Sequence, residues 1–179
     1  MEGHSMGSST SMESAPSHAA DPTAEFSDAD VMFASIMYPH HAQAVEMAAM
    51  GEGRTIDPDV VALAGEIADA QKPEMDQLTS WLSAWGRPAP SADANSMGST
   101  DHGSGSGMMT SRDMDSLMSL AGAEFDRQWL TMMIEHHEGA VKMAEKQIAD
   151  GSNVDAVAMA RTIVETQNAE ISRMQQLLG

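Results

Sequence analysis

Two His-His pairs, each with a methionine one helical turn upstream, are the residues of this sequence best suited to chemistry. These six residues are Met37, His40, His41, Met133, His136 and His137. Side chains three and four residues apart project from one side of an α-helix, so each methionine is expected beside its two histidines. Thioether sulfur and imidazole nitrogen together suit soft ions such as Cu(I) and Ag(I). The spacing therefore predicts two Met/His metal sites, with Cu(I) as the preferred ion.

Further methionines follow each pair. Met47 and Met143 lie seven residues after the first histidine of their pairs, roughly 10 Å along a helix axis, which is too far to share one mononuclear site with that histidine. Met50, three residues beyond Met47, could complete a separate site, but Lys146 replaces it in the second half. We therefore count Met47 and Met143 among the candidate ligands and Met50 as an additional one.

The two histidine pairs belong to an internal duplication. A shift of 96 positions (122 − 26) places residues 26–82 over residues 122–178 without a gap, and 16 of the 57 aligned positions are identical. Chance would give roughly four identities, so the second half is predicted to repeat the structure of the first. The identities include apolar positions, but also an Asp, a Gln and a Glu, which a mere scaffold does not need.

Each half is predicted to form a helical hairpin, and the two hairpins an all-α four-helix bundle. Ser27 and Asp30 form a capping-box-like start for a first helix that Gly51 ends. Asp57 and Pro58 open a second helix that ends near residues 85–86. In the second half, helices are expected from about 124 to 150 and from about 153 to 178.

The predicted domain organisation follows from these hairpins. Residues 1–25 form a flexible Ser/Met-rich N-terminal segment, 26–86 the first hairpin and 122–179 the second, so that 26–179 make one bundle domain. Residues 87–121 form a Gly/Ser/Met-rich linker, expected to be mobile as far as residue 107 and to carry a short helix around 111–120.

Heptad spacing places the candidate ligands on inward-facing seams, where unpaired polar groups are costly. The seam of the second helix takes either Gln71 or Ala70. Asp30 and Asp126 are expected to cap helices or orient histidines. For Glu74 and Glu170 two roles stay open, as partners of histidine or as carboxylate ligands. Further candidate ligands are Met132, His102, Met108 and Met109.

Two prolines distinguish the halves. Pro39 precedes the first His pair and Pro73 precedes Glu74, whereas Glu135 and Ala169 stand at the equivalent positions. Proline inside a helix removes a backbone hydrogen bond and kinks the axis. The two halves are therefore not expected to be geometrically identical.

Composition excludes several classes of protein. The 179 residues carry 27 acidic and 9 basic side chains, a formal net charge of −18 that argues against binding to nucleic acid. The absence of Cys excludes disulfides, thiol nucleophiles and iron–sulfur clusters. No apolar run approaches the roughly 20 residues that span a bilayer, and residues 1–4 lack the features of a signal peptide. Eighteen Met is an unusual excess that favours soft-metal binding.

The two His-His segments, 30–48 and 125–144, resemble the twin signatures of the domain-of-unknown-function 305 family, and 63–82 and 159–178 resemble its second-helix motif. The resemblance implies a ferritin-like bundle, export from the cytoplasm and, as for some members, copper binding. The resemblance implies that the site residues of the family correspond to these positions: Asp30, Met37, His40, His41, Met47, Asp126, Met133, His136, His137 and Met143.

The leading hypothesis is an extracytoplasmic protein, periplasmic, secreted or anchored at the cell surface, that holds Cu(I) or Ag(I) for sequestration, storage or transfer to a partner protein. No nucleophile or general base is evident, so the protein is not expected to be an enzyme. A rival hypothesis is a carboxylate/His di-iron oxidase, although methionine stands where such bundles place the Glu of each Glu-x-x-His. A third is a metal-free structural or adaptor bundle.

Overall fold

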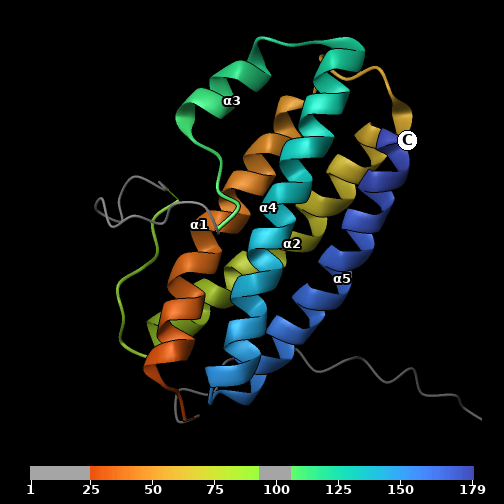
Figure 1. Cartoon of the computed structure of the whole chain (residues 1–179). Coiled ribbons are helices and arrows are strands. Elements are labelled where there is room, and N and C mark those ends of the chain that lie inside the picture. Colours follow the sequence, from red (N-terminus) through yellow and green to blue (C-terminus); the bar gives the residue numbers. More distant parts are fainter. Residues whose placement is uncertain (1–24, 93–105) are drawn as a thin grey trace, which may run out of the picture.

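Helices make up most of residues 25–92 and 106–179, the parts of the chain that this computed structural model describes. The helices are α1 (Asp28–Met50), α2 (Pro58–Ala84), α3 (Ser111–Met118), α4 (Gly122–Asp150) and α5 (Val154–Leu178). The four long helices lie side by side, and the short α3 lies beside their upper end (Figure 1). The described residues contain no strand, which confirms the predicted all-α, ferritin-like four-helix bundle. The predicted N-terminal segment and His102 lie outside them.

Helix boundaries follow the capping signals of the sequence. The Ser27 hydroxyl accepts the Asp30 backbone N–H, while the Asp30 carboxylate accepts the Ser27 backbone N–H at 2.7 Å, a capping box at the start of α1. Asp57 caps α2, with Pro58 at the first helical position. Asn153 caps α5 through a bond from the Ala156 N–H. The helix ends therefore agree closely with the predicted ones.

The central contact of the bundle joins α1 to α4, which run antiparallel. Near the start of α1, Phe33 packs in the same apolar cluster as Ala144, whereas near its end Met47 packs with Trp129. The Trp129 indole N–H donates to the Met47 backbone oxygen across a distance of 2.8 Å. The outer helices complete the two hairpins, α2 against α1 and α5 against α4 (Figure 1).

The apolar core is divided into two layers, called upper and lower as in the view of Figure 1. The upper layer includes Met47, Leu63, Leu117, Phe125, Trp129, Met133 and Met174. The lower layer includes Phe33, Met37, Leu78, Trp81, Leu82, Ala140 and Ile163. Along α1, residues 40–41 fall between these layers, as residues 136–137 do along α4. A layer of histidines therefore crosses the middle of the core.

Most positions on the predicted seams are buried, and on α4 the buried face drifts away from the heptad. Gln71 is buried and Ala70 is exposed, which resolves the alternative on α2. On α4, Met143 is only half-buried, while Ala144 and Gln147 face inward. A straight α-helix has 3.6 residues per turn, so a strict 3.5-residue pattern drifts around it over several turns. Toward the C-terminal end of α4, the buried position is therefore one residue later than the heptad predicts.

Both prolines lie inside continuous helices. α1 extends through Pro39 and α2 through Pro73. Pro39 is buried, directly before the first His pair, whereas Pro73 is exposed. Each removes one backbone donor from its helix, and only the first hairpin is affected.

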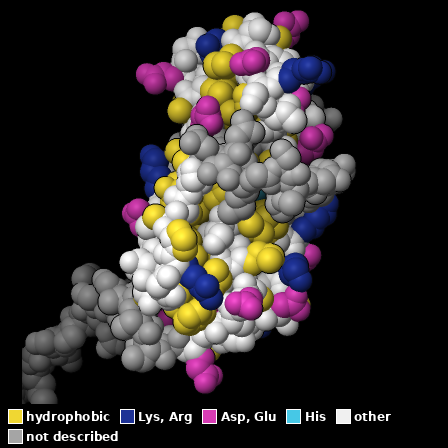
Figure 2. All heavy atoms as spheres, turned by 90° about the vertical axis from the view of Figure 1, so that its left-hand side faces the viewer, with side chains coloured by type: hydrophobic (Ala, Val, Ile, Leu, Met, Phe, Trp, Pro, Cys, Tyr) yellow, Lys and Arg dark blue, Asp and Glu magenta, His cyan; other side chains and the backbone are white. Residues whose placement is uncertain are grey.

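The surface carries both signs of charge. On the face shown in Figure 2, acidic and basic side chains are spread out with hydrophobic ones between them, rather than gathered in one patch. Within the described ranges, no helix is both long and apolar enough to cross a membrane.

Candidate metal centre

Four histidines meet at mid-height, where α1 and α4 pack together. Their exposed fractions are 1 % for His40 and His136 and 0 % for His41 and His137. The His40 and His136 rings contact each other across the helix interface, with centroids 3.7 Å apart and planes tilted by 35°. The ring centroids of His136 and His137 are 6.3 Å apart. The antiparallel arrangement of the two long helices thus joins two sequence motifs into one cluster.

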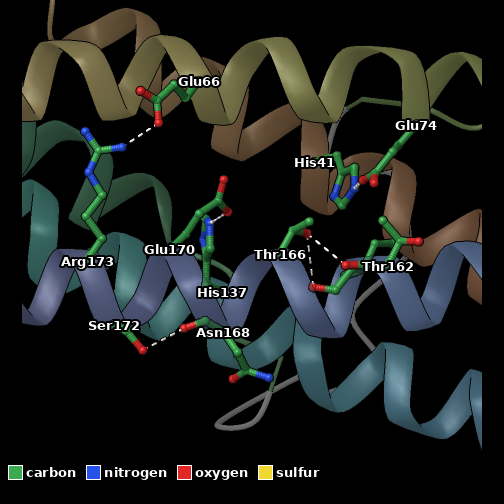
Figure 3. Close-up of polar contacts among 11 residues, drawn as sticks. His41, Glu66, Glu74, His137, Thr162, Thr166, Asn168, Glu170, Ser172 and Arg173 are labelled. Carbon is green, nitrogen blue, oxygen red and sulfur yellow. Dashed lines mark hydrogen bonds and ion pairs between the residues drawn. The ribbon is translucent and has the colours of Figure 1, made fainter.

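Each outer histidine is bonded to a carboxylate of its own hairpin. His41 Nε2 lies 2.6 Å from Glu74 Oε2, and His137 Nε2 lies 2.9 Å from Glu170 Oε2 (Figure 3). The two glutamates have the same side-chain exposure, 19 %. A carboxylate accepts, so the Nε2 atoms carry the hydrogens, and in the neutral ring Nδ1 is the nitrogen with the lone pair. Of the two roles left open for the glutamates, the geometry is that of histidine partners.

His40 has a different partner. His136 makes no hydrogen bond of good geometry among the described residues, and the group that acts on its ring is the nearby His40 backbone. His40 Nε2 lies 2.9 Å from the backbone oxygen of Ser106, which can only accept, so Nδ1 again keeps the lone pair. Both ring nitrogens of His136 are buried without a hydrogen-bond partner in the described parts of the chain, as is Nδ1 of each of the other three. Such nitrogens suit a metal ion, which satisfies a lone pair that water cannot reach.

Burial keeps the inner pair uncharged. It lowers the pKa of His40 to about 3, with the neighbouring His41 adding to the effect. Burial, followed by the neighbouring His40, lowers the pKa of His136 well below its usual range. Neutral imidazole is the form that binds metal, so these two side chains can act as ligands without first losing a proton.

The candidate methionines approach the histidine layer from both sides. Met37 is fully buried in the lower layer and Met133 in the upper layer. Met47, also fully buried, shares the upper layer with Met133, while half-buried Met143 packs against the lower layer that contains Met37. Each layer therefore brings together methionines from α1 and from α4, which spacing along a single helix did not predict.

Two glutamines belong to the same polar layer and were not among the predicted ligands. Gln71 and Gln167 are 4 % and 3 % exposed, and the side-chain oxygen of each lacks a partner in the described structure. They precede Glu74 and Glu170 by three residues and are equivalent in the duplication. That repetition of a polar residue on a buried seam was the signal that could have identified them.

The two candidate aspartates lie near the starts of α1 and α4, and Asp30 is the one with observed contacts among the described residues. Asp30 accepts the backbone N–H groups of Ser152 and Asn153 and the side-chain amide of Gln147, which fixes the turn between α4 and α5. Burial raises its pKa, but hydrogen bonds led by those from Ser27 outweigh burial and leave the pKa lowered. Asp126 is 7 % exposed, and its Oδ1 has no partner among the described residues. The capping role predicted for Asp30 is thus observed.

The remaining candidate methionines lie toward the upper end. Met132 is buried in the upper layer and Met50 is partly buried against it. Met108 and Met109 line, together with Met132, a surface pocket of about 500 Å³ beside α4. Within residues 25–92 and 106–179, no three His, Asp or Glu side chains are placed to hold one ion together. The candidate donors are the histidines of one layer and the methionines in the apolar layers on either side of it.

Comparison with other proteins places this arrangement in a family. The model of a domain of unknown function (DUF305) matches residues 30–178. A DUF305 protein of Streptomyces coelicolor, provisionally described as secreted, is 36 % identical, with a TM-score of 0.74 over 84 % of this chain and 91 % of the other. A DUF305 fragment from Deinococcus radiodurans is 33 % identical, with a TM-score of 0.76 over 86 % of this chain and 97 % of the other.

The fold is also that of CopM. Its Cu(II)-bound form is 31 % identical to this chain, with a TM-score of 0.70 over 83 % of this chain and 95 % of CopM. CopM has also been solved with Cu(I) and with Ag bound. No curated protein matches this sequence. The match over residues 30–178, together with the repeated His-His motifs and the shared bundle, shows that this chain belongs to the DUF305 family.

Proposed function

We propose that this protein binds Cu(I), and Ag(I) in its place, at the histidine layer between α1 and α4. The observation that carries the proposal is the set of buried imidazoles whose Nδ1 atoms have no partner among the described residues, two of which, His40 and His136, burial keeps uncharged. Carboxylates hold the opposite nitrogens of His41 and His137, an arrangement that orients histidines for metal binding. The thioethers of Met37 and Met133 complete a soft donor set.

The structural relatives support the choice of metal. CopM, which shares this fold at 31 % identity, has been solved with Cu(I), Cu(II) and Ag bound. Imidazole nitrogen and thioether sulfur favour copper and silver over the hard ions that prefer carboxylates. In this chain both glutamates next to the layer are bonded to histidine, which leaves the di-iron alternative without its bridging carboxylates.

The cellular role is proposed from the same features. A buried site with no evident nucleophile or general base suits reversible holding of an ion, so we assign the protein to copper sequestration, storage or transfer rather than to catalysis. A related DUF305 protein is provisionally described as secreted, which favours a location outside the cytoplasm. A copper-transfer partner protein would then receive the ion.

An anaerobic Cu(I) titration against a competing chelator tests the proposal. The full chain is compared with the double variant Met37→Leu/Met133→Leu and with the double variant His41→Gln/His137→Gln. Met32→Leu is the matched control, because Met32 lies on the same helix and is 58 % exposed. Circular dichroism and thermal unfolding check that each variant keeps the bundle.

Both double variants are expected to lose at least about tenfold in Cu(I) affinity, the usual cost of removing a ligand or its orientation, while the control is unchanged. Equal affinity in all folded variants would place the copper elsewhere, for example on methionines outside the bundle. No chelator-competitive binding by the full chain would leave the histidine layer as core structure and overturn the proposal.

A further inference from the structure

A short segment, Ser106–Met109, crosses the central helices at the height of the histidines; we call it the strap. It comes directly before α3 and runs along α1 and α4 (Figure 1). His40 Nε2 donates to the Ser106 backbone oxygen across 2.9 Å. At its other end, the Gln43 side chain bonds the Met109 backbone twice, donating to the oxygen at 2.9 Å and accepting from the N–H at 2.7 Å. The first two residues of the strap, Ser106 and Gly107, are the last two of the linker range that the sequence predicts to be mobile.

Two glycines allow this close approach. Gly139 faces the strap from α4, and a Cβ there would overlap the Ser106 carbonyl group. Gly107 has a φ of +70°, and a Cβ there would overlap the backbone oxygen of Glu135. The position equivalent to Gly139 in the first half is Gln43, since 139 − 43 = 96. One half of the duplication thus leaves room for the strap, and the other half supplies the side chain that fastens it.

The strap provides a hydrogen-bond acceptor for His40, as the glutamates do for the outer histidines. Glu74 and Glu170 take the Nε2–H of His41 and His137, and the Ser106 carbonyl takes the Nε2–H of His40. The equivalent nitrogen of His136 makes no such hydrogen bond among the described residues, although the nearby His40 backbone acts to raise the pKa of that ring. A hydrogen bond to one ring nitrogen of a histidine decides which tautomer is present and which nitrogen is free to bind metal.

We propose that the strap is a positioning element for His40. The Ser106 carbonyl, held by Gln43, Gly107 and Gly139, fixes the Nε2–H tautomer and directs Nδ1 toward the metal. Because only the first His pair has both rings fixed in this way, the two halves are unequal, and the pair His40/His41 takes up the first ion. The part of the proposal that concerns metal rests on the proposed function; the part that concerns the tautomer does not.

The first test uses the metal-free full chain. Gly139→Ala places a methyl group where the strap carbonyl lies, while alanine is a better helix former than glycine, so α4 should persist. Gly65→Ala is the matched control, because the space around that helical glycine is open. Long-range ¹H–¹⁵N correlation spectra report the tautomer of each histidine ring, and hydrogen exchange of the Met109 amide reports whether the strap is docked.

In the wild type and in Gly65→Ala we expect the Nε2–H tautomer at His40, His41 and His137. In Gly139→Ala, Met109 exchange should rise by about tenfold or more as its hydrogen bond is lost, and His40 alone should become a mixture of tautomers. A pure Nε2–H tautomer at His40 after the strap has been released would overturn the proposal. So would Nδ1–H at His40 in the wild type, or Met109 exchange that Gly139→Ala leaves unchanged.

The second test titrates the same proteins with Ag(I). The wild type should take up a first ion more tightly than a second, and Gly139→Ala should weaken the first step by about tenfold, the low end for loss of a partner that orients a ligand. Gln43→Ala should act in the same direction and Gly65→Ala should have no effect. Unchanged affinity in both strap variants would refute positioning and leave the proposed function intact. If even the wild type binds no Ag(I), the proposed function fails and the claim of unequal sites fails with it, while the tautomer result is judged by the first test.

Discussion

The two hairpins contain the same His–Glu contacts but differ in the residues that surround their inner histidines. Each has a His–Glu hydrogen bond at the same place in the repeat, with the same carboxylate exposure. They differ beside the inner histidines, where Pro39 is matched by Glu135 and Gln43 by Gly139. His40 also receives a backbone acceptor from the strap, the carbonyl of Ser106. The repeat has therefore preserved the polar side chains of the inner face, while the neighbouring positions have diverged to hold a segment that lies on one side of the bundle.

The largest expected effect concerns the inner histidines, which the two halves contribute equally. Their folded-state pKa values are depressed, to about 3 for His40, whereas an unfolded histidine titrates near 6.5. Below about pH 6.5 the unfolded chain therefore binds protons that the folded, metal-free protein does not. Stability should fall as the pH drops, by about 1 kcal/mol per pH unit for each of the two histidines.

Urea unfolding between pH 7 and pH 5 measures this slope. His40→Gln and His136→Gln should each remove about half of the pH dependence that the two histidines give to the free energy of unfolding. A slope that survives in both variants would assign the acid sensitivity to other groups, and a slope lost in one variant alone would show that the inner histidines are not equivalent in burial.

The next largest effect compares the outer histidines. His41→Ala and His137→Ala each leave a cavity and remove the partner of a half-buried glutamate, so each should lower the free energy of unfolding by about 2 to 3 kcal/mol. Because the two contacts repeat, the two losses should agree within about 1 kcal/mol in urea denaturation at pH 7. A clear difference between them would mean that the proline-containing helices of the first hairpin hold their His–Glu pair differently.

Sequence patterns were sufficient for the features that repeat. The shift of 96 positions, the His-His pairs and the capping residues Ser27 and Asp57 predicted the bundle and its inner face, because periodicity and caps act locally along the chain. The glutamates could not be assigned, since the choice between ligand and histidine partner depends on side-chain geometry between helices. The sequence therefore predicted which residues make up the site but not the hydrogen bonds between them.

Other features left no signal of that kind. The acceptor for His40 is a backbone carbonyl, and any residue type at position 106 would offer one. From the sequence alone, Gly139 is only a residue of low helix propensity, and its role is evident only once the segment packed against it is known. The pairing of Met47 with Met133 crosses between two helices, so spacing within either helix could not show it. What sequence reasoning missed here are contacts between segments distant in the chain.

A smaller effect is expected at the two glutamines of the polar layer. Gln71→Leu and Gln167→Leu each replace a buried amide whose oxygen lacks a partner in the described structure with an apolar group of similar size. The metal-free protein should gain up to about 1 kcal/mol in each case, because an unsatisfied polar group is removed. Thermal unfolding without metal measures the gain. A loss of stability in either variant would show that its amide is bonded in solution.

The smallest effect concerns a contact that the repeat does not share. Arg173 on α5 forms an ion pair with Glu66 on α2, whereas the equivalent positions, Gln77 and Thr162, cannot form one (Figure 3). The two side chains are 39 % and 59 % exposed, so water and salt screen their attraction. Arg173→Ala should therefore cost less than about 0.5 kcal/mol, and the difference should vanish in 1 M salt. A larger, salt-independent loss would mean that the Arg173 stem packs between α2 and α5, and that the outer helices, like the strap, are held by a contact that the repeat lacks.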